Sequence, residues 1–257
     1  MSCPRKEEKF LTLLKWFDGS RIMTSIPTFD FNNPLIQART FETLWLQGCS
    51  YEDFLGRLYD DVDQACSLIM EDVEKHLKLT ETEISSSIWL YLKGCKIYQV
   101  EKDTDANGNV DIIVRTDRHK WFGEAKIWSS NSYLNEGYLQ LTERYSKGEK
   151  KNNHGGMFIY IKPESDQDNE EEIIASWKEY LKTTYSDLEI YDCSLDDSRF
   201  FSKRKHSGTK HDYHVRYIPI TLLHIPRDKS GRKAQKYQER TKTFDENSEK
   251  NSEAKSI

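Results

Sequence analysis

The sequence feature that most constrains the fold is residues 109–128, which read N-V-D-I-I-V-R-T-D-R-H-K-W-F-G-E-A-K-I-W. This stretch holds two runs rich in β-branched and aromatic residues, separated by a short polar turn, and the composition favours two strands of a hairpin. Apolar residues occupy successive positions of both runs, which predicts a central hairpin covered on both faces. Charged side chains on such strands are costly to bury unless they are paired or bind a metal.

Three charged residues of this hairpin are expected to meet. Side chains alternate between the two faces of a strand, so Glu124 and Lys126 share a face, with Ala125 between them. Pairing of the two strands would bring Asp111, near the start of the first strand, to the same place. Carboxylates suit a hard cation such as Mg²⁺, and a neighbouring lysine can stabilise negative charge or orient a water. The alternative is an ordinary acid–lysine pair across two strands on a solvated face.

The pattern Val110-Asp111, a spacer and Glu124-Ala125-Lys126 resembles the PD-(D/E)xK signature of restriction-endonuclease-like, Holliday-resolvase-like and RecB-like nucleases. Val110 stands where the family name has proline, and the resemblance covers residues 80–162. It implies Mg²⁺- or Mn²⁺-dependent hydrolysis of a nucleic-acid phosphodiester, with DNA as a more frequent substrate than RNA. Asp111, Glu124 and the carbonyl of Ala125 would bind the metal, and Lys126 would position the attacking water or stabilise the transition state.

The flanking segments predict the element order of such a core. Helices are expected at residues 80–93 and 129–148, and strands at residues 96–100 and 155–161. With the hairpin they give the order helix, three strands, helix and strand (α-β-β-β-α-β). We therefore expect an α/β protein with a helical N-terminal extension (residues 1–79) and a restriction-endonuclease-like core that carries a mixed α/β C-terminal addition (residues 80–226). A charged tail follows (residues 227–257).

Two further residues are second-rank candidates for the site. Glu83 completes a capping box with Thr80, but it also lies where many members of the resembled family carry a glutamate on the helix before the first core strand. Gln140 and Tyr145 resemble a glutamine and a tyrosine found near RecB-like sites, although their spacing is one residue longer. A polar helix stripe beside a core tyrosine explains Gln140 equally well.

A second motif suggests calcium. Asp103, Asp105, Asn107 and Gly108 are spaced as in the opening of a calcium-binding loop, but Val114 stands where the loop requires glutamate. Strands rather than helices are expected to flank the motif, and a polar Asn-Gly turn accounts for it more simply. A calcium-dependent interaction protein therefore stays as one alternative function. The other is a non-catalytic nucleic-acid-binding or assembly module of the same fold.

Charge is distributed unevenly along the chain. The helix expected from residue 50 has an acidic face that should be solvated, whereas residues 199–242 hold thirteen Lys and Arg against three Asp and Glu. Basic side chains near a nucleic acid release condensed counterions, so the basic segment predicts phosphate contacts. Residues 227–257 are almost without apolar side chains, which predicts a disordered tail that adds sequence-independent binding. The predicted phosphate contacts are Arg144, Lys203, Arg204 and Lys205.

Overall composition excludes several classes of protein. The net charge of −5 over 257 residues argues against a uniformly basic nucleic-acid binder. The five cysteines show no C-x-x-C pair, which argues against a zinc site and suggests a reducing cytosol. No apolar run has the length of a membrane span, so a cytoplasmic protein without a membrane partner is expected. By analogy of fold, such a nuclease would be an effector subunit of a bacterial antiviral defence system that needs a protein activator or self-association.

Overall fold

The computed structural model describes residues 33–105, 109–165, 168–194, 196, 198–228 and 230–255. The chain divides into two compact units, residues 1–43 and residues 44–257. Of the first unit, the described part is the beginning of helix α2 (Pro34–Gly48), where proline takes the first helical position and its missing N–H costs nothing. The boundary expected after residue 79 does not coincide with this division.

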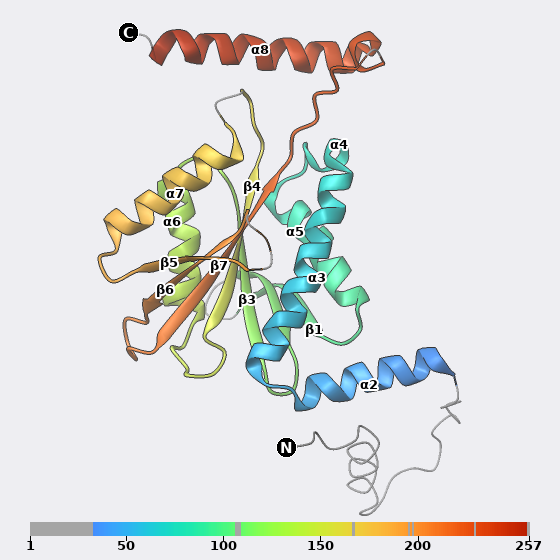
Figure 1. The fold of residues 1–257 in the computed structure, drawn as a ribbon, viewed down its shortest axis with the longest axis vertical. Coiled ribbons are helices and arrows are strands. Elements are labelled where there is room, and N and C mark those ends of the chain that lie inside the picture. Colours follow the sequence, from blue (N-terminus) through green and yellow to red (C-terminus); the bar gives the residue numbers. More distant parts are fainter. Residues whose placement is uncertain are drawn as a thin grey trace, which may run out of the picture. The chain divides into compact units, whose positions relative to one another are not determined.

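A mixed sheet of seven strands organises the described part of the second unit (Figure 1). The order across the sheet is β1-β2-β3-β4-β7-β6-β5. Strand β4 is parallel to both β3 and β7, and the other neighbours are antiparallel. The strands are β1 (Gln99–Asp105), β2 (Asn109–Arg115), β3 (Lys120–Ile127), β4 (His154–Ile161), β5 (Glu189–Asp192), β6 (Phe200–Lys205) and β7 (Asp212–Thr221).

Helices cover both faces of the sheet (Figure 1). Buried residues of α3 and α5 share one core cluster with the strands, and those of α6, the π-helix η1 and α7 share the other. The helices are α3 (Tyr51–Glu71), α4 (Val73–His76), α5 (Glu81–Gly94), α6 (Asn131–Leu139), η1 (Gln140–Tyr145), α7 (Glu170–Thr184), the 3-10 helix η2 (Gly231–Lys233) and α8 (Gln235–Lys255).

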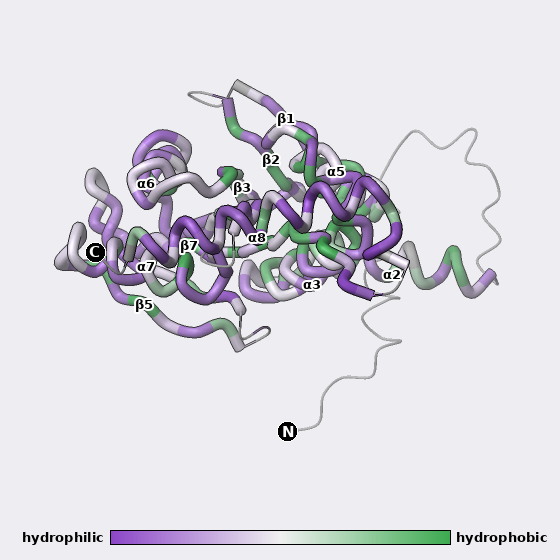
Figure 2. The backbone as a smooth tube through the Cα atoms, turned by 90° about the horizontal axis from the view of Figure 1, so that it is seen from above, coloured by the Kyte–Doolittle hydropathy of each residue, from purple (hydrophilic) through white to green (hydrophobic). Residues whose placement is uncertain are grey.

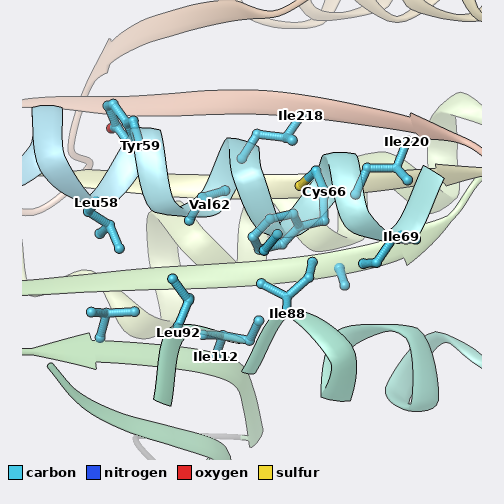
Figure 3. Packing of buried hydrophobic residues seen from close by; sticks show 14 of the residues in the cluster. Leu58, Tyr59, Val62, Cys66, Ile69, Ile88, Leu92, Ile112, Ile218 and Ile220 are labelled. Carbon is cyan, nitrogen blue, oxygen red and sulfur yellow. The ribbon is translucent and has the colours of Figure 1, made fainter. Parts of the chain in front are cut away.

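The first cluster is a hydrophobic layer of aliphatic and aromatic side chains between α3, α5 and the sheet (Figure 3). The indole of Trp121 fills the middle of this layer because two glycines leave room for it. A Cβ atom on Gly156 would lie 2.2 Å from the Trp121 ring, and one on Gly123 would lie 2.8 Å from it. Residues seen packed together in this layer include Leu58, Val62, Ile69, Ile88, Leu92, Ile112 and Ile218.

The expected order of helix, three strands, helix and strand is confirmed by α5, β1, β2, β3, α6 and β4. The first strand begins at Gln99 rather than at residue 96, because residues 95–98 form a turn and a bend in which Lys96 has a φ of 61°. Strand β6 was not predicted, since four of its six residues are basic or polar. The mixed α/β character of the C-terminal addition is confirmed by α7, β5, β6 and β7.

The prediction of disorder is wrong for Gln235–Lys255, which form helix α8. Figure 2 shows this helix as largely hydrophilic along its length. Its glutamate, lysine, glutamine and alanine residues are good helix formers, so the segment can be helical without a large apolar face. The helix is tied to the rest of the unit by hydrogen bonds, since Lys236 Nζ and the Tyr237 hydroxyl donate to Glu74 at 2.5 and 2.8 Å.

The prediction of a solvated acidic face on α3 is wrong for two aspartates. Asp61 is buried, and its Oδ2 accepts from the Tyr98 hydroxyl at 2.8 Å. Asp63 accepts two hydrogen bonds of 2.8 Å from the guanidinium of Arg216 and also pairs with Arg199. Helical periodicity identifies the polar face of α3, but the arginines that cover part of it come from residues far along the chain.

Disulfides and membrane-spanning helices can be assessed for the described residues. None of the four cysteines that the structure describes forms a disulfide. No helix in the described ranges combines the length and the apolar character needed to cross a membrane.

Candidate active site on strand β3

The hairpin of β2 and β3 brings the three predicted residues together. Antiparallel pairing sets Ile112 opposite Gly123. Asp111, the residue before Ile112, therefore lies beside the residues of β3 that follow Gly123. The Oδ2 atom of Asp111 accepts the main-chain N–H of Ala125 at 2.7 Å. This bond ties the carboxylate to β3 at the position between the other two site residues, as the sequence predicts for a covered hairpin.

Glu124 and Lys126 lie on one face of β3 and are almost fully buried, with exposed fractions of 1% and 7%. Lys126 Nζ donates to Glu124 Oε1 at 2.5 Å. The aliphatic part of the lysine packs against α6 at Gly137, where a Cβ atom would lie 3.0 Å from Lys126 Cγ. Glycine at this position lets the helix approach the lysine closely.

Burial changes the acidity of all three groups. Burial raises the pKa of Asp111 to about 6, against the opposing effect of the N–H bond from Ala125. Burial and the neighbouring Asp111 carboxylate raise the pKa of Glu124 to about 7. Burial alone would lower the pKa of Lys126, but the carboxylates around it outweigh this effect and raise the pKa. Lys126 therefore stays an ammonium, while the pKa values of Asp111 and Glu124 lie close to neutral pH.

The site has more carboxylates than ammonium groups, and this excess of negative charge would favour a bound cation. The Oε2 atom of Glu124 is buried without a well-formed hydrogen bond among the described residues, and the Tyr145 hydroxyl is the donor next to the carboxylate. Besides burial, the charge of Asp111 raises the pKa of Glu124 and the charge of Glu81 raises the pKa of Asp111, while the ammonium of Lys126 opposes both effects. In the described ranges no three His, Cys, Asp or Glu side chains form a complete metal site. Mg²⁺ nevertheless needs only one or two carboxylates, together with waters and substrate phosphate.

The glutamate that α5 contributes to the site is Glu81, which the sequence did not single out. Its Oε2 atom accepts the main-chain N–H of Ile127 at 2.7 Å, and its Oε1 atom lies 3.9 Å from Lys126 Nζ. Glu83 instead accepts from the main-chain N–H and the hydroxyl of Thr80, both at 2.8 Å. The capping role of Glu83 is thus confirmed. The position near Lys126 that was expected for Glu83 is occupied by Glu81, two residues earlier on the same helix.

Gln140 and Tyr145 are brought together by the π-helix η1. A π turn is one residue wider than an α turn, and the N–H of Ser146 bonds the carbonyl of Leu141 five residues before it at 3.2 Å. The extra residue between Gln140 and Tyr145 is absorbed in this way. Gln140 Nε2 donates to the Tyr145 hydroxyl at 3.2 Å, and that hydroxyl donates to the carbonyl of Asn109 at 2.6 Å.

Tyr145 lies close to the acids, whereas Gln140 reaches them through the tyrosine. Burial and the charge of Glu124 raise the pKa of the Tyr145 phenol, which places the two side chains next to each other. Tyr133, at the start of α6, is a further residue that the sequence did not indicate. Lys126 Nζ lies 5.7 Å from the centre of its ring, and its hydroxyl donates to Glu81 Oε2 at 3.4 Å. No local signal marks Tyr133, because its role depends on where α6 begins.

The basic residues predicted to contact phosphate divide into two groups. Arg144 is exposed on η1. Lys203, Arg204 and Lys205 each pair with a carboxylate, at 2.5 Å to Glu189, 2.8 Å to Asp187 and 3.0 Å to Asp212 respectively. Their positive charge is therefore compensated locally, which weakens the prediction for this second group.

The loop considered for calcium binding is only partly described, because residues 106–108 lie outside the described ranges. Strands β1 and β2 flank it as an antiparallel pair, with Thr104 opposite Val110. This arrangement is the one expected for a hairpin turn and differs from the helix–loop–helix of a calcium-binding loop.

Comparison of the chain with models of known families, with curated proteins and with solved structures gave no match.

Proposed function

We propose that the protein is a metal-dependent nuclease that hydrolyses a nucleic-acid phosphodiester, and that its core is of the restriction-endonuclease-like type. The observation that carries the proposal is the convergence of Asp111, Glu124 and Lys126 on β2 and β3, which brings two carboxylates beside one ammonium. Burying two carboxylates beside one ammonium is unfavourable unless a cation joins them.

Each side chain then has a defined task. Asp111, Glu124 and the carbonyl of Ala125 would hold Mg²⁺ or Mn²⁺. Bound there, the ion would polarise the scissile phosphate and lower the pKa of the attacking water. Because its pKa is raised, Lys126 acts as a hydrogen-bond donor and a positive charge rather than as a general base. It orients the water or stabilises charge on the phosphate as the P–O bond to the leaving oxygen breaks.

Residues around this set hold it in place. Glu81 fixes the end of β3 through the N–H of Ile127 and attracts the Lys126 ammonium. Tyr145 and Gln140 support the face of β3 that carries Glu124. Both DNA and RNA present the phosphodiester that this arrangement would cleave, and DNA is the first candidate on the basis of the resemblance described above.

The experiment that tests the proposal incubates the purified chain with single- and double-stranded DNA and RNA in Mg²⁺, Mn²⁺, Ca²⁺ or EDTA. Cleavage is expected in Mg²⁺ or Mn²⁺, with little in Ca²⁺, whose larger size and looser coordination fit the reaction poorly. Glu124→Ala should abolish it, whereas Glu189→Ala, at the far edge of the sheet, should not. Cleavage by Glu124→Ala at the wild-type rate, or full activity in EDTA, would exclude the proposed site.

A binding module without catalysis is the second candidate. Under that proposal the wild-type chain binds nucleic acid in every metal tested and cleaves none. The presence of two carboxylates, Asp111 and Glu124, beside the single ammonium of Lys126 favours the catalytic alternative, because a hairpin with a purely structural role does not need this excess of negative charge.

A further inference from the structure

Two neighbouring loops form a basic surface next to the candidate site. They are residues 144–151, which run from the end of η1 towards β4, and residues 205–211, which connect β6 to β7; together they are termed the basic double loop. His211 Nδ1 lies 2.9 Å from the carbonyl of Gly148, and the Ser207 hydroxyl donates to Glu143. The two loops are therefore in direct contact although about sixty residues separate them in sequence.

A single glycine makes this contact close. Gly148 has a φ of +61°, in the left-handed region that favours glycine. A Cβ atom at Gly148 would lie 2.3 Å from Thr209 Oγ1 and 2.5 Å from His206 Nδ1. Both the backbone conformation and the space available thus require glycine where the loops meet.

The charge of the first loop is not compensated. Its basic side chains are exposed, and none of them has a carboxylate partner among the described residues. The one acid between them, Glu149, accepts from the side-chain amide of Asn152 at 3.2 Å. This differs from Lys203, Arg204 and Lys205, each of which pairs with an acid. The uncompensated side chains are Arg144, Lys147, Lys150 and Lys151.

The loop is joined to the elements of the site. Tyr145, the last residue of η1, packs its ring 6.1 Å from that of Phe122 on β3. At the other end of the loop, Asn152 Oδ1 accepts the N–H of Lys120, where β3 begins. Glu124 lies four residues further along β3, or about 13 Å at the rise of a strand, which equals roughly four base-pair steps of a duplex.

We propose that the basic double loop, through Lys147, Lys150 and Lys151, is the surface on which the sugar–phosphate backbone of a polynucleotide docks beside the site. The identity of this partner rests on the proposed nuclease function. The protein carries a net charge of −5, so a polyanion is repelled by most of its surface and attracted by this patch. Separate phosphates spaced along one backbone match separate lysines on one loop, and such contacts carry no sequence preference.

The test measures binding of labelled DNA and RNA oligonucleotides in EDTA, over a salt series, so that no cleavage is needed. The triple variant Lys147→Gln, Lys150→Gln, Lys151→Gln should bind on the order of tenfold or more weakly, with the log–log salt slope reduced by about 2–3. A control with the same loss of charge, Lys78→Gln, Lys96→Gln, Lys182→Gln, uses exposed lysines outside the basic segment and should bind as the wild type. Replacing the three loop lysines by arginine should restore binding, which separates loss of charge from misfolding.

The outcomes separate this proposal from the proposed function. Weaker binding by the loop variant, with control and arginine variants unaffected, supports the docking surface even if the chain cleaves nothing. Equal affinities and salt slopes for loop variant, control and wild type overturn it, even if the chain is an active nuclease. A wild-type chain that binds no oligonucleotide at low salt overturns it as well.

Discussion

Two groups of buried charges lie on opposite faces of the same sheet region and differ in their balance. Around Asp63, two arginines face two carboxylates, because Arg199 Nε also lies 3.3 Å from Asp196. Around Lys126, the carboxylates of Glu124, Glu81 and Asp111 all act on one ammonium. The first group is neutral as a whole, and the second has surplus negative charge.

The difference in charge balance supports the proposal that the Lys126 group binds a ligand. Arg216 is fully buried, and its guanidinium makes a two-pronged contact with Asp63 while stacking 4.5 Å above the ring of Tyr59. This group joins α3 to β7, and its two positive charges meet two carboxylates, although nitrogen atoms of Arg199 and Arg216 are also buried without a hydrogen bond. The Lys126 group has more carboxylates than ammonium groups and keeps two acids at raised pKa values. Under the proposed function, a bound cation would balance this charge.

The largest effect is expected from breaking the balanced group. Arg216→Ala leaves Asp63 short of a buried partner and should lower the free energy of unfolding by about 3–5 kcal/mol. The control Arg227→Ala breaks an exposed pair with Asp245 and should cost about 0–1 kcal/mol. Urea unfolding measures both values. An Arg216→Ala protein as stable as the Arg227→Ala protein would show that the Asp63 group does not hold α3 on the sheet.

Breaking the unbalanced group should affect the reaction rather than stability. Lys126→Ala removes the ammonium of the site, which would lie near the phosphate of the proposed substrate. The change should lower the cleavage rate about 100- to 1000-fold. Lys162 is a matched control, since its Nζ is also held inside the protein, by the carbonyl of Leu79 at 2.5 Å. Lys162→Ala should cleave at close to the wild-type rate. Single-turnover cleavage rates measured on one oligonucleotide test this prediction. Equal rates for the two variants would show that Lys126 has no special role in cleavage.

The pH dependence of stability should differ with and without metal. With pKa values of about 6 and 7, Asp111 and Glu124 hold protons that the unfolded chain has already released. The free energy of unfolding should therefore fall as pH rises from about 4 to 7. Mg²⁺ binds the ionised acids, so it should raise the melting temperature more at about pH 8 than at about pH 5.5. Thermal melts across pH measure this effect.

Asp111→Asn sharpens the same test. The asparagine still offers an oxygen to the N–H of Ala125, but it removes the charge that raises the pKa of Glu124. The fall in stability with pH should be smaller in this variant, and Mg²⁺ should no longer stabilise it. A Mg²⁺ effect that is the same in the variant and in the wild type would place the ion elsewhere.

The smallest effects should separate the two glutamates of α5. Thr80→Ala, which breaks the helix cap shared with Glu83, should cost about 1 kcal/mol of stability and leave the cleavage rate of the folded protein unchanged. Glu81→Gln should slow cleavage, because Lys126 then loses one of the carboxylates that attract it. Glu83→Gln is the control for the site. If Glu83→Gln slowed cleavage more than Glu81→Gln, Glu83 would replace Glu81 in the unbalanced group.

The sequence predicted the hairpin and its three charged residues because both follow from local rules. Alternation along β3 places Glu124 and Lys126 on one face whatever packs against it, and apolar runs indicate a covered strand. The sequence did not indicate Glu81, because the local signal on this helix, the capping box, involves Glu83. Which neighbour points at the site depends on how α5 lies against the end of β3, and a single sequence does not contain that information.

Predictions from charge alone were the least successful. Charge patterns predict a solvated acidic face on α3 and phosphate contacts for the basic segment after residue 199, yet Asp63 and Arg216 bind each other within the protein. Pairing between residues so distant in sequence leaves no local pattern. Low hydropathy likewise predicts disorder for the residues of helix α8, whereas their high helix propensity favours the observed helix.

The π-helix has a consequence for how the chain tolerates changes in length. A wide turn accommodates one residue more than an α-helix would, without rotating the segment before it or after it. Removing one exposed residue from η1, such as Glu143, would allow the helix to continue in α form from α6 up to Tyr145. Deletions of one residue elsewhere in α6 would turn its buried face away from the sheet. The segment next to the acids is thus the place where this helix can gain or lose a residue while the rest of its register is preserved.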